Sequence, residues 1–218
     1  NKVRIYSQSK GPNTIVEMID SKQPHSSKAL YFDMPKYNVR MEFLPSDFIQ
    51  VNAKMNDKMI AQAMTLLDVQ KDDVILDLFC GLGNFTLPLA TQVKTVVGIE
   101  GEPSLVERAQ HNAQLNQLDN VTFHVADLRK NHEQSDWFKQ DYNKVLIDPP
   151  RSGAWEVLPL IAQTKAKTLL YVSCHPASLA RDTDRLVHEF GFKLIKAGVM
   201  DMFPHTSHVE SIALFVRN

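Results

Sequence analysis

The sequence predicts an α/β fold with a seven-stranded, mostly parallel sheet whose last strand is antiparallel, preceded by a small β region. Short, nearly continuous apolar runs alternate with amphipathic helical stretches, which is typical of a parallel sheet covered by helices on both faces. Near the end, two strand-like runs follow each other without a long crossover helix, so we expect them to pair as a hairpin. The expected strands are residues 74–79, 95–100, 121–125, 144–147, 168–172, 192–199 and 211–216.

Helices are expected at residues 56–67, 86–90, 103–115, around Trp137, at 154–163 and at 177–190. The first of them repeats apolar residues at helical spacing from Met59 to Leu67. Ahead of it, residues 3–43 contain β-prone runs that are separated by Pro24 and Pro35. We therefore predict two parts, a partial β-rich region over residues 1–46 and a catalytic domain over residues 47–218.

The composition is that of an ordinary globular protein. Of the 218 residues, 44% are hydrophobic and 22% are charged, which argues against intrinsic disorder. A net charge of −1 excludes a polybasic arm or an acidic tail as the basis of function. No apolar run approaches the roughly 20 residues that cross a bilayer, and no signal-peptide pattern opens the chain. We predict a cytoplasmic protein without membrane contact and, because it begins with Asn1, a part of a longer chain.

The first two strands end in residues that suit a nucleoside ligand, which such sheets bind outside the carboxyl ends of their strands. Gly81 and Gly83 follow the first strand and let the backbone approach a ligand. A dinucleotide fingerprint needs a third glycine where Thr86 stands, which disfavours a nicotinamide dehydrogenase. Glu100 can accept hydrogen bonds from ribose hydroxyls, and Asp127 can accept one from an adenine amino group. The set suits S-adenosylmethionine, although the glycines by themselves could form only a tight turn.

Two later strands end in reactive groups. The segment Asp148-Pro149-Pro150-Arg151 predicts a short rigid loop that aims a carboxylate into the cleft, because both prolines fix φ. Cys174 follows the fifth strand and precedes a helix, whose N-terminal amides are expected to lower the pKa of the thiol. Cys80 is expected to pack as a small buried hydrophobe behind the glycine loop. Two cysteines form neither a disulfide framework nor a Cys-x-x-Cys metal site.

Four segments together resemble the RNA 5-methyluridine methyltransferases, most closely the bacterial RumA/RlmD type that acts on 23S ribosomal RNA. They are DLFCGLGNF at 77–85, DPPR at 148–151, YVSCHPASLARD at 171–182 and DMFPHTSHVES at 201–211. The resemblance covers nearly the whole chain from about Phe48. It implies a Rossmann-like class I methyltransferase fold, with Cys174 as nucleophile and Glu210 as general base. The implied S-adenosylmethionine contacts are Gln50, Phe79, Gly81, Asn84, Glu100, Asp127 and Asp148.

The resemblance also implies the partner, a ribosomal RNA whose target uridine is flipped into the cleft. Arg151, Phe203 and His205 are candidates to hold that base. The family further implies an N-terminal RNA-binding barrel and a four-cysteine iron–sulfur site, so a cluster is expected only in a preceding part of the full-length protein. We expect a monomer that by itself binds RNA weakly and in a salt-sensitive way. The alternatives are a tRNA 5-methyluridine methyltransferase, which the segment 203–211 disfavours, and a catalytically silent RNA- or nucleotide-binding module, which Cys174 and Glu210 disfavour.

Overall fold

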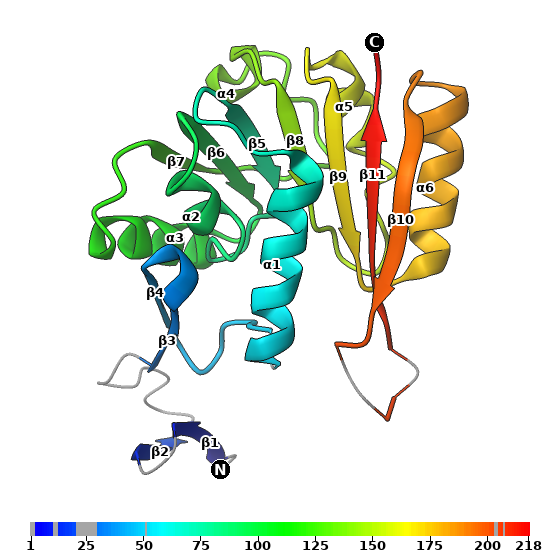
Figure 1. The fold of residues 1–218 in the computed structure, drawn as a ribbon. Helices are drawn as coiled ribbons and strands as arrows, with labels where there is room; N and C mark the ends of the chain where they lie inside the picture. Colours follow the sequence, from blue (N-terminus) through cyan, green and yellow to red (C-terminus); the bar gives the residue numbers. More distant parts are fainter. Residues whose placement is uncertain (1–2, 11–12, 21–29, 51, 203–204, 207) are drawn as a thin grey trace.

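A seven-stranded sheet forms the middle layer of the molecule, with helices on both of its faces (Figure 1). The computed structural model describes residues 3–10, 13–20, 30–50, 52–202, 205–206 and 208–218. The strand order is β10-β11-β9-β8-β5-β6-β7, and β11 runs antiparallel to both of its neighbours, β9 and β10. The predicted fold class is therefore confirmed, including the hairpin formed by the last two strands.

Each strand of this sheet begins and ends within one residue of its predicted bounds. The apolar runs are informative because the central strands β5, β8 and β9 are buried on both faces, so residues that point to either face are apolar. Ile75, for example, belongs to the core under one layer of helices, whereas its neighbour Leu76 belongs to the core under the other. The strands are β5 Val74–Leu78, β6 Thr95–Glu100, β7 Val121–Val125, β8 Lys144–Ile147, β9 Thr168–Ser173, β10 Lys193–Met200 and β11 Glu210–Val216.

The helices divide between the two faces according to the core that they join. On one face, α1 (Ala53–Leu67), α2 (Thr86–Ala90) and α3 (Pro103–Leu115) bury residues such as Met59, Leu87 and Ala109 in one cluster. On the other, α4 (Asp136–Lys139), α5 (Leu158–Gln163) and α6 (Pro176–His188) bury Trp137, Leu158 and Leu186 in the second. Figure 1 shows α1 and α6 on opposite sides of the β9–β11 region.

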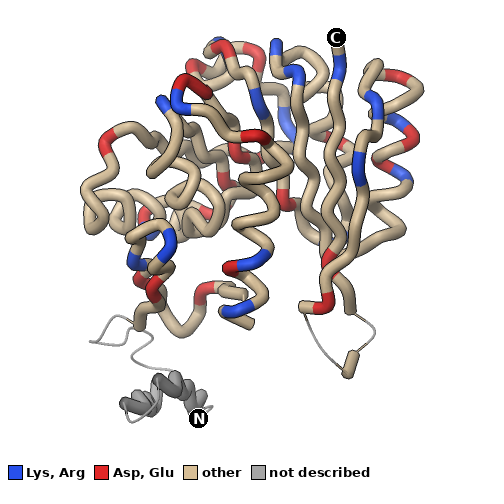
Figure 2. Tube along the Cα trace, viewed as in Figure 1, with Lys and Arg blue, Asp and Glu red and all other residues tan. Residues whose placement is uncertain are grey.

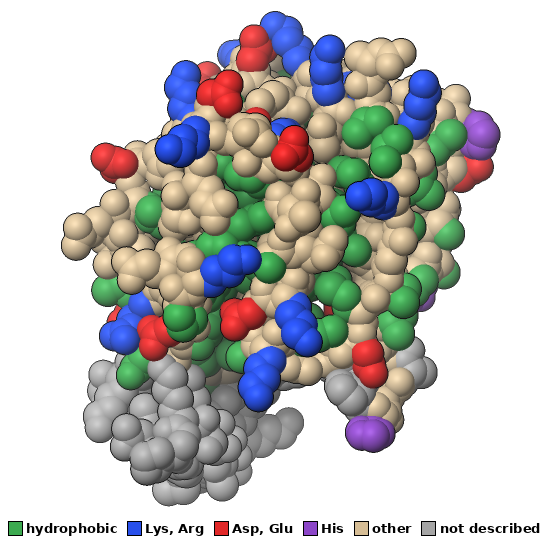
Figure 3. Space-filling model, in the orientation of Figure 1, with side chains coloured by type: hydrophobic (Ala, Val, Ile, Leu, Met, Phe, Trp, Pro, Cys, Tyr) green, Lys and Arg blue, Asp and Glu red, His purple; other side chains and the backbone are tan. Residues whose placement is uncertain are grey.

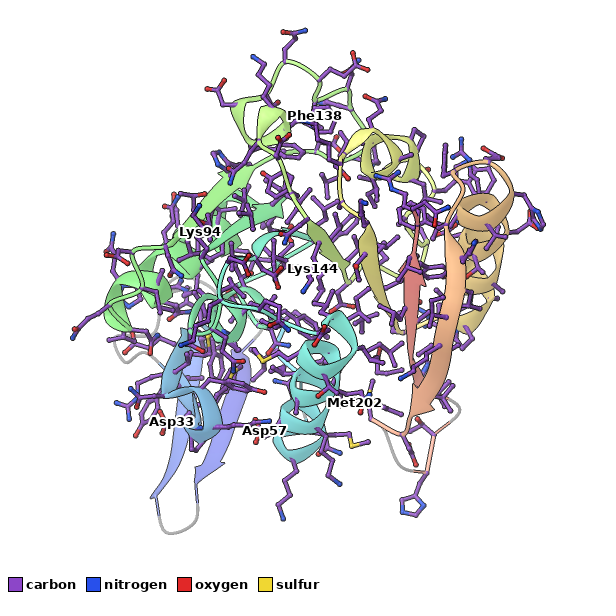
Figure 4. The ribbon with its side chains drawn as sticks, turned by 45° about the horizontal axis from the view of Figure 1, so that its top comes forward. Asp33, Asp57, Lys94, Phe138, Lys144 and Met202 are labelled. Atoms are coloured by element: carbon purple, nitrogen blue, oxygen red, sulfur yellow. The ribbon has the colours of Figure 1, made fainter. Side chains whose placement is uncertain are left out.

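Helix α6 begins one residue before its predicted start, and α1 and α5 begin three and four residues away from theirs, where polar contacts explain the differences. Helix α1 begins at Ala53 instead of residue 56 because the Asn52 side chain caps it, accepting a hydrogen bond from the Met55 amide at 3.2 Å. The side-chain Nδ2 of Asn52 also donates a hydrogen bond to the Met202 carbonyl at 3.3 Å. This bond connects the start of α1 to the segment after β10, where Figure 4 labels Met202. Helix α5 begins at Leu158 instead of residue 154, and the Ala154 amide bonds to Asp182.

The N-terminal region contains two small antiparallel sheets, as its β-prone runs predict. Strands β1 (Val3–Lys10) and β2 (Asn13–Asp20) form one, and β3 (Leu30–Met34) and β4 (Val39–Phe43) form the other, with a 3-10 turn at Pro35–Tyr37. The β3–β4 hairpin docks on α3, where Glu42 and Asn112 exchange hydrogen bonds of 2.9 and 3.0 Å. The division of the chain at residue 46 stays a prediction, and this hairpin packs directly against the larger part.

Charges of both signs are interspersed along the described trace (Figure 2) and over the face that the space-filling view presents (Figure 3). No helix among the described residues is long and apolar enough to cross a membrane. The described residues also contain no group of three or more His, Cys, Asp or Glu side chains that could hold a metal ion.

Candidate active site

A cavity of about 500 Å³ opens at the carboxyl edge of the sheet, and its wall contains all but one of the predicted catalytic and cofactor-binding residues. Parallel strands end at the same edge, so the segments after β5, β6, β8 and β9 meet there. Strand β11 runs the opposite way, and its first residue therefore lies at that edge too. The predicted residues in the wall are Gln50, Phe79, Gly81, Asn84, Glu100, Asp148, Cys174 and Glu210.

The glycine loop after β5 is fastened to the end of β6 by the Glu100 carboxylate. The Gly81 amide donates to Glu100 Oε2 at 3.1 Å, and the amides of Gly101 and Glu102 donate to Oε1 at 2.7 and 3.0 Å. The loop needs left-handed backbone at Phe79, Gly81 and Gly83, with φ of 63°, 55° and 99°. Phe79 is strained there, as residues at ligand sites often are. These bonds leave Glu100 Oε2 with capacity to accept a further hydrogen bond.

Two amide side chains face the cavity near the glycine loop. Asn84 exchanges hydrogen bonds of 2.8 and 3.0 Å with Asn56 of α1, which holds that helix against the loop. Gln50 presents a buried Oε1 atom that has no hydrogen-bond partner among the described residues. A buried acceptor without a partner is costly, and a donor on a bound ligand would satisfy it.

Asp127 is the predicted site residue that does not belong to the cavity wall. Its carboxylate binds Arg129, with Nε to Oδ1 at 2.8 Å and Nη2 to Oδ2 at 3.0 Å. These hydrogen bonds are the main cause that lowers the pKa of Asp127 to about 2. The expected contact of Asp127 with an adenine amino group stays a prediction.

Cys174 and Glu210 come together through the register of β9 and β11. Ser173 pairs with Ser211 across these antiparallel strands. Cys174, which follows Ser173, therefore lies next to Glu210, which precedes Ser211. Cys174 is partly buried and Glu210 is buried, with 4% of its surface exposed. Asp148, at the end of the neighbouring β8, shares the same cavity. One thiol and two carboxyl groups therefore meet in a confined space.

The expected lowering of the thiol pKa is wrong. Burial raises the pKa of Cys174, and the charges of Glu210 and Asp148 raise it further, against a smaller opposing effect of Arg151. Burial likewise raises the pKa of Glu210, and it raises that of Asp148 well above the usual value, helped by Glu210 and Asp77. Desolvation and like charges both disfavour the ionised forms, and here they outweigh the amides at the start of α6.

The turn that carries Cys174 is fixed by its neighbours. Ser173 Oγ accepts a hydrogen bond from the His175 amide and donates one to the His175 carbonyl, both at 3.1 Å. His175 in turn caps α6, its Nδ1 accepting from the Ser178 amide at 3.3 Å. Cys80 is buried as predicted, and burial raises its pKa well above the usual value, so it is an inert thiol.

Several residues of the cavity wall were not predicted from the sequence. Leu105 lies in the first turn of the helix after Glu100, a position next to the ligand edge that could have been predicted. Phe32 comes from the β3–β4 hairpin, and no local pattern links it to this cavity. Phe48 and Ile49 precede Gln50 in the wall. Of the three candidates to hold a base, Arg151 lines the cavity, His205 is exposed and absent from the wall, and Phe203 lies outside the described residues.

Asp77 lies behind the glycine loop, and from its burial we expect the stability of the protein to depend on pH. Its Oδ2 accepts from Thr86 at 2.6 Å, its Oδ1 has no partner among the described residues, and burial raises its pKa to about 7. Between pH 4 and 7 the folded state holds a proton that the unfolded state has lost. The free energy of unfolding should therefore fall with rising pH, by up to about 4 kcal/mol across this window.

Urea unfolding at pH 5, 6, 7 and 8 measures this effect. Asp77→Asn, which keeps an acceptor for Thr86, should flatten the decline, whereas Asp72→Asn, at an exposed carboxylate ahead of the same strand, should leave it in place. An unchanged slope in Asp77→Asn would contradict the assignment.

The strand order, the glycine loop and the carboxylate at the end of the second parallel strand define a Rossmann-like fold of the class I methyltransferase type. A solved tRNA (uracil-54, C5)-methyltransferase from Pyrococcus abyssi, in complex with S-adenosyl-L-homocysteine, superposes with a TM-score of 0.75 at 27% identity, over 88% of this chain and 45% of that one. The TYW2 protein of M. jannaschii, in complex with AdoMet, has the same fold at 20% identity, with a TM-score of 0.65 over 93% of this chain and 91% of that one.

The chain belongs to the tRNA (Uracil-5-)-methyltransferase family, whose model matches residues 25–218. It is 59% identical over 186 residues to a 23S rRNA (uracil(1939)-C(5))-methyltransferase RlmD of Xanthomonas campestris pv. campestris strain 8004, covering 85% of this chain and 42% of the relative. It is 53% identical over 211 residues to the protein of that name in Stenotrophomonas maltophilia strain R551-3, covering 97% of this chain and 46% of the relative. The chain thus spans less than half the length of these curated relatives.

Proposed function

We propose that the chain is the catalytic part of an enzyme that transfers a methyl group from S-adenosylmethionine to carbon 5 of a uridine in 23S ribosomal RNA. The observation that carries this proposal is the meeting of Cys174 and Glu210 in one cavity with Glu100 and Asp148. The higher identity to the ribosomal relatives than to the solved tRNA enzyme supports the ribosomal substrate. We further propose that it acts in the cytoplasm, as a monomer, on a uridine flipped out of the RNA stack.

The cavity fits the proposed cofactor on three counts. Glu100 would hold the ribose hydroxyls, and the unpartnered Gln50 oxygen would accept a hydrogen bond from a donor of the bound molecule. Phe79 and Leu105 give an apolar wall on which an adenine ring can lie. When bound, the cofactor supplies a methyl group on a positively charged sulfur. A cation among Asp148, Glu210 and Cys174 would favour their ionised forms, which burial and mutual repulsion disfavour.

The chemistry accounts for the two catalytic groups. Carbon 5 of uracil is too weak a nucleophile to attack the methyl group, so the ring must first be activated. The Cys174 thiol gives its proton to water, and the thiolate adds to carbon 6, which moves the electron pair of the double bond towards carbon 5 and the adjacent carbonyl oxygen. Carbon 5 then takes the methyl group, whose bond to the sulfonium sulfur breaks and leaves S-adenosyl-L-homocysteine. The Glu210 carboxylate removes the remaining proton from carbon 5, and the double bond re-forms as the carbon–sulfur bond breaks.

Tritium release tests this proposal, because the complete cycle expels the hydrogen on carbon 5, and dependence on S-adenosylmethionine distinguishes turnover from solvent exchange through reversible thiolate addition. The 218-residue chain is incubated with S-adenosylmethionine and with either 23S ribosomal RNA or tRNA, each carrying tritium on carbon 5 of uridine. We expect release from the ribosomal RNA that depends on the cofactor and weakens as salt rises. Release from tRNA alone would instead support the tRNA enzyme.

The catalytically silent alternative requires its own test. RNA that contains 5-fluorouridine cannot lose the substituent on carbon 5, so an active enzyme should remain covalently attached to it in the presence of S-adenosylmethionine. A silent RNA- or nucleotide-binding module would bind this RNA without forming a covalent product. Titration with NAD, for which we expect no binding, addresses the dehydrogenase alternative that Thr86 already disfavours.

Glu100→Gln should weaken S-adenosylmethionine binding at least about tenfold. Glutamine replaces one carboxylate oxygen by a donor, which opposes the backbone amides that the carboxylate binds and removes an acceptor for the ribose. Isothermal titration calorimetry measures the affinity. The matched control is Glu102→Gln, at an exposed carboxylate two residues further on that accepts a hydrogen bond from the Ser104 hydroxyl. Equal affinities of Glu100→Gln and the unmodified chain would exclude Glu100 from the cofactor site.

A further inference from the structure

The loop that carries Asp148 and Arg151 is bound to α6 by one buried carboxylate. Asp182, in the second turn of α6, has no exposed surface. Its Oδ2 accepts hydrogen bonds from the Ala154 amide at 2.7 Å and from the Tyr171 hydroxyl at 2.8 Å. A single side chain thus connects the end of this loop, strand β9 and helix α6.

Arg181 completes the connection from the adjacent position. Its Nε and Nη2 atoms donate to Asp182 Oδ1 at 2.9 and 2.6 Å, and Nη2 also donates to the Ser152 carbonyl at 2.9 Å. Both oxygens of the buried carboxylate are therefore bonded, and its charge is paired with a guanidinium. Such a fully bonded group is costly to disturb, since loss of one partner leaves a buried charge without compensation.

Gly153 makes this close approach of backbone and carboxylate geometrically feasible. Its φ is +85°, and a Cβ atom at this position would lie 2.6 Å from Asp182 Oδ2 and 2.7 Å from Arg181 Nη2. A side chain there would force the loop or the Asp182 and Arg181 side chains to shift, and so disturb their contact. The contact is therefore specified from both sides, by a carboxylate on the helix and by a glycine in the loop.

Asp182 does not line the cavity, but the two segments that it joins supply residues to the cavity wall. The loop carries Asp148, and α6 begins at Pro176, immediately after the turn of Cys174 and His175. We propose that Asp182 is a positioning residue that holds the Asp148–Gly153 segment against α6, and thereby fixes Asp148 relative to the Cys174 thiol. This inference rests on the proposed function, because the position of Asp148 affects catalysis only if Cys174 is the nucleophile.

Alkylation of Cys174 by iodoacetamide, followed as a function of pH, tests the proposal without RNA or cofactor. The charged groups that act on this thiol are Asp148 and Glu210, which oppose ionisation, and Arg151, which favours it. If the loop loosens in Asp182→Asn, Asp148 moves away and water enters. The midpoint of the alkylation profile should then shift to lower pH by about one unit. Peptide mass spectrometry separates Cys174 from the buried Cys80.

Asp184→Asn is the matched control, since it makes the same change on the same helix at a carboxylate that is 77% exposed and contacts His188. Its profile should coincide with that of the unmodified chain. An unchanged midpoint in a folded Asp182→Asn variant would overturn the proposal. Should Asp182→Asn fail to fold, Arg181→Lys decides, because lysine keeps a positive charge beside Asp182 but cannot reproduce the guanidinium fork that binds both Asp182 Oδ1 and the Ser152 carbonyl. A smaller shift in the same direction supports the proposal, and none overturns it.

A second measurement separates positioning from general destabilisation. With tritiated RNA and saturating S-adenosylmethionine, Asp182→Asn should lower kcat about 100-fold at a temperature where circular dichroism shows the variant to be folded, because small displacements of reacting groups are costly. A kcat equal to that of the unmodified chain under these conditions would count against the proposal. Absence of turnover in the unmodified chain would contradict the proposed function alone, since the alkylation profiles do not depend on it.

Discussion

Replacement of Cys174 by alanine is expected to reduce methyl transfer to RNA to background while S-adenosylmethionine binding persists. Without the sulfur, carbon 5 of the uridine is never activated, so no later step can compensate. The cofactor contacts proposed for Glu100 and Gln50 lie elsewhere in the cavity wall and remain. Tritium release measures turnover, and calorimetry measures binding of the cofactor.

Cys174→Ser provides the comparison for this result. A serine hydroxyl occupies nearly the same space but ionises far less readily than a thiol, so this variant should be inactive as well. The position already disfavours ionisation, because burial and two carboxyl groups raise the pKa of the thiol. Full activity of either variant, with an unchanged thermal midpoint, would rule out the covalent mechanism.

Replacement of Glu210 by glutamine is expected to stop the reaction after methyl transfer. Glutamine has nearly the same shape and cannot take the proton from carbon 5, so the bond between Cys174 and carbon 6 cannot be broken by elimination. The covalent protein–RNA product should accumulate and migrate as a slow band on a denaturing gel. Because burial raises the pKa of Glu210, this group is suited to accepting a proton near neutral pH.

The double variant Cys174→Ala/Glu210→Gln controls for bands of other origin, and it should give none. A Glu210→Gln variant that turns over normally without accumulating a covalent product would exclude Glu210 as the base. A variant that neither turns over nor forms the product would mean that Glu210 acts before the methyl group is transferred.

The strands and most of the cavity wall could be predicted from the sequence because their signals are local. A strand buried on both faces is an apolar run of limited length, and the residue after it lies at the ligand edge of a parallel sheet. Gly81, Glu100, Asp148 and Cys174 all follow this rule. Glu210 does not, since it opens an antiparallel strand, and its catalytic role was predicted only through the resemblance to a known family.

Other features depend on contacts between distant segments. The β3–β4 hairpin brings Phe32 into the cavity wall, and Asp182 bonds to a loop that is remote in the chain. The direction of the Cys174 pKa shift also depends on such distant contacts. Sequence alone reveals the helix that follows Cys174 and predicts a lowered pKa, whereas the packed structure adds burial and the charges of Glu210 and Asp148, which raise it.

By itself, the sequence determined the fold class, the strand bounds and the identity of most groups at the ligand edge, because alternation of apolar runs and helices depends on neighbours in the chain. The tertiary structure alone decided which of those groups meet, how deeply they are buried and in which direction their pKa values shift. Strand register and helix packing bring residues together across long sequence separations, and desolvation arises only when they are packed.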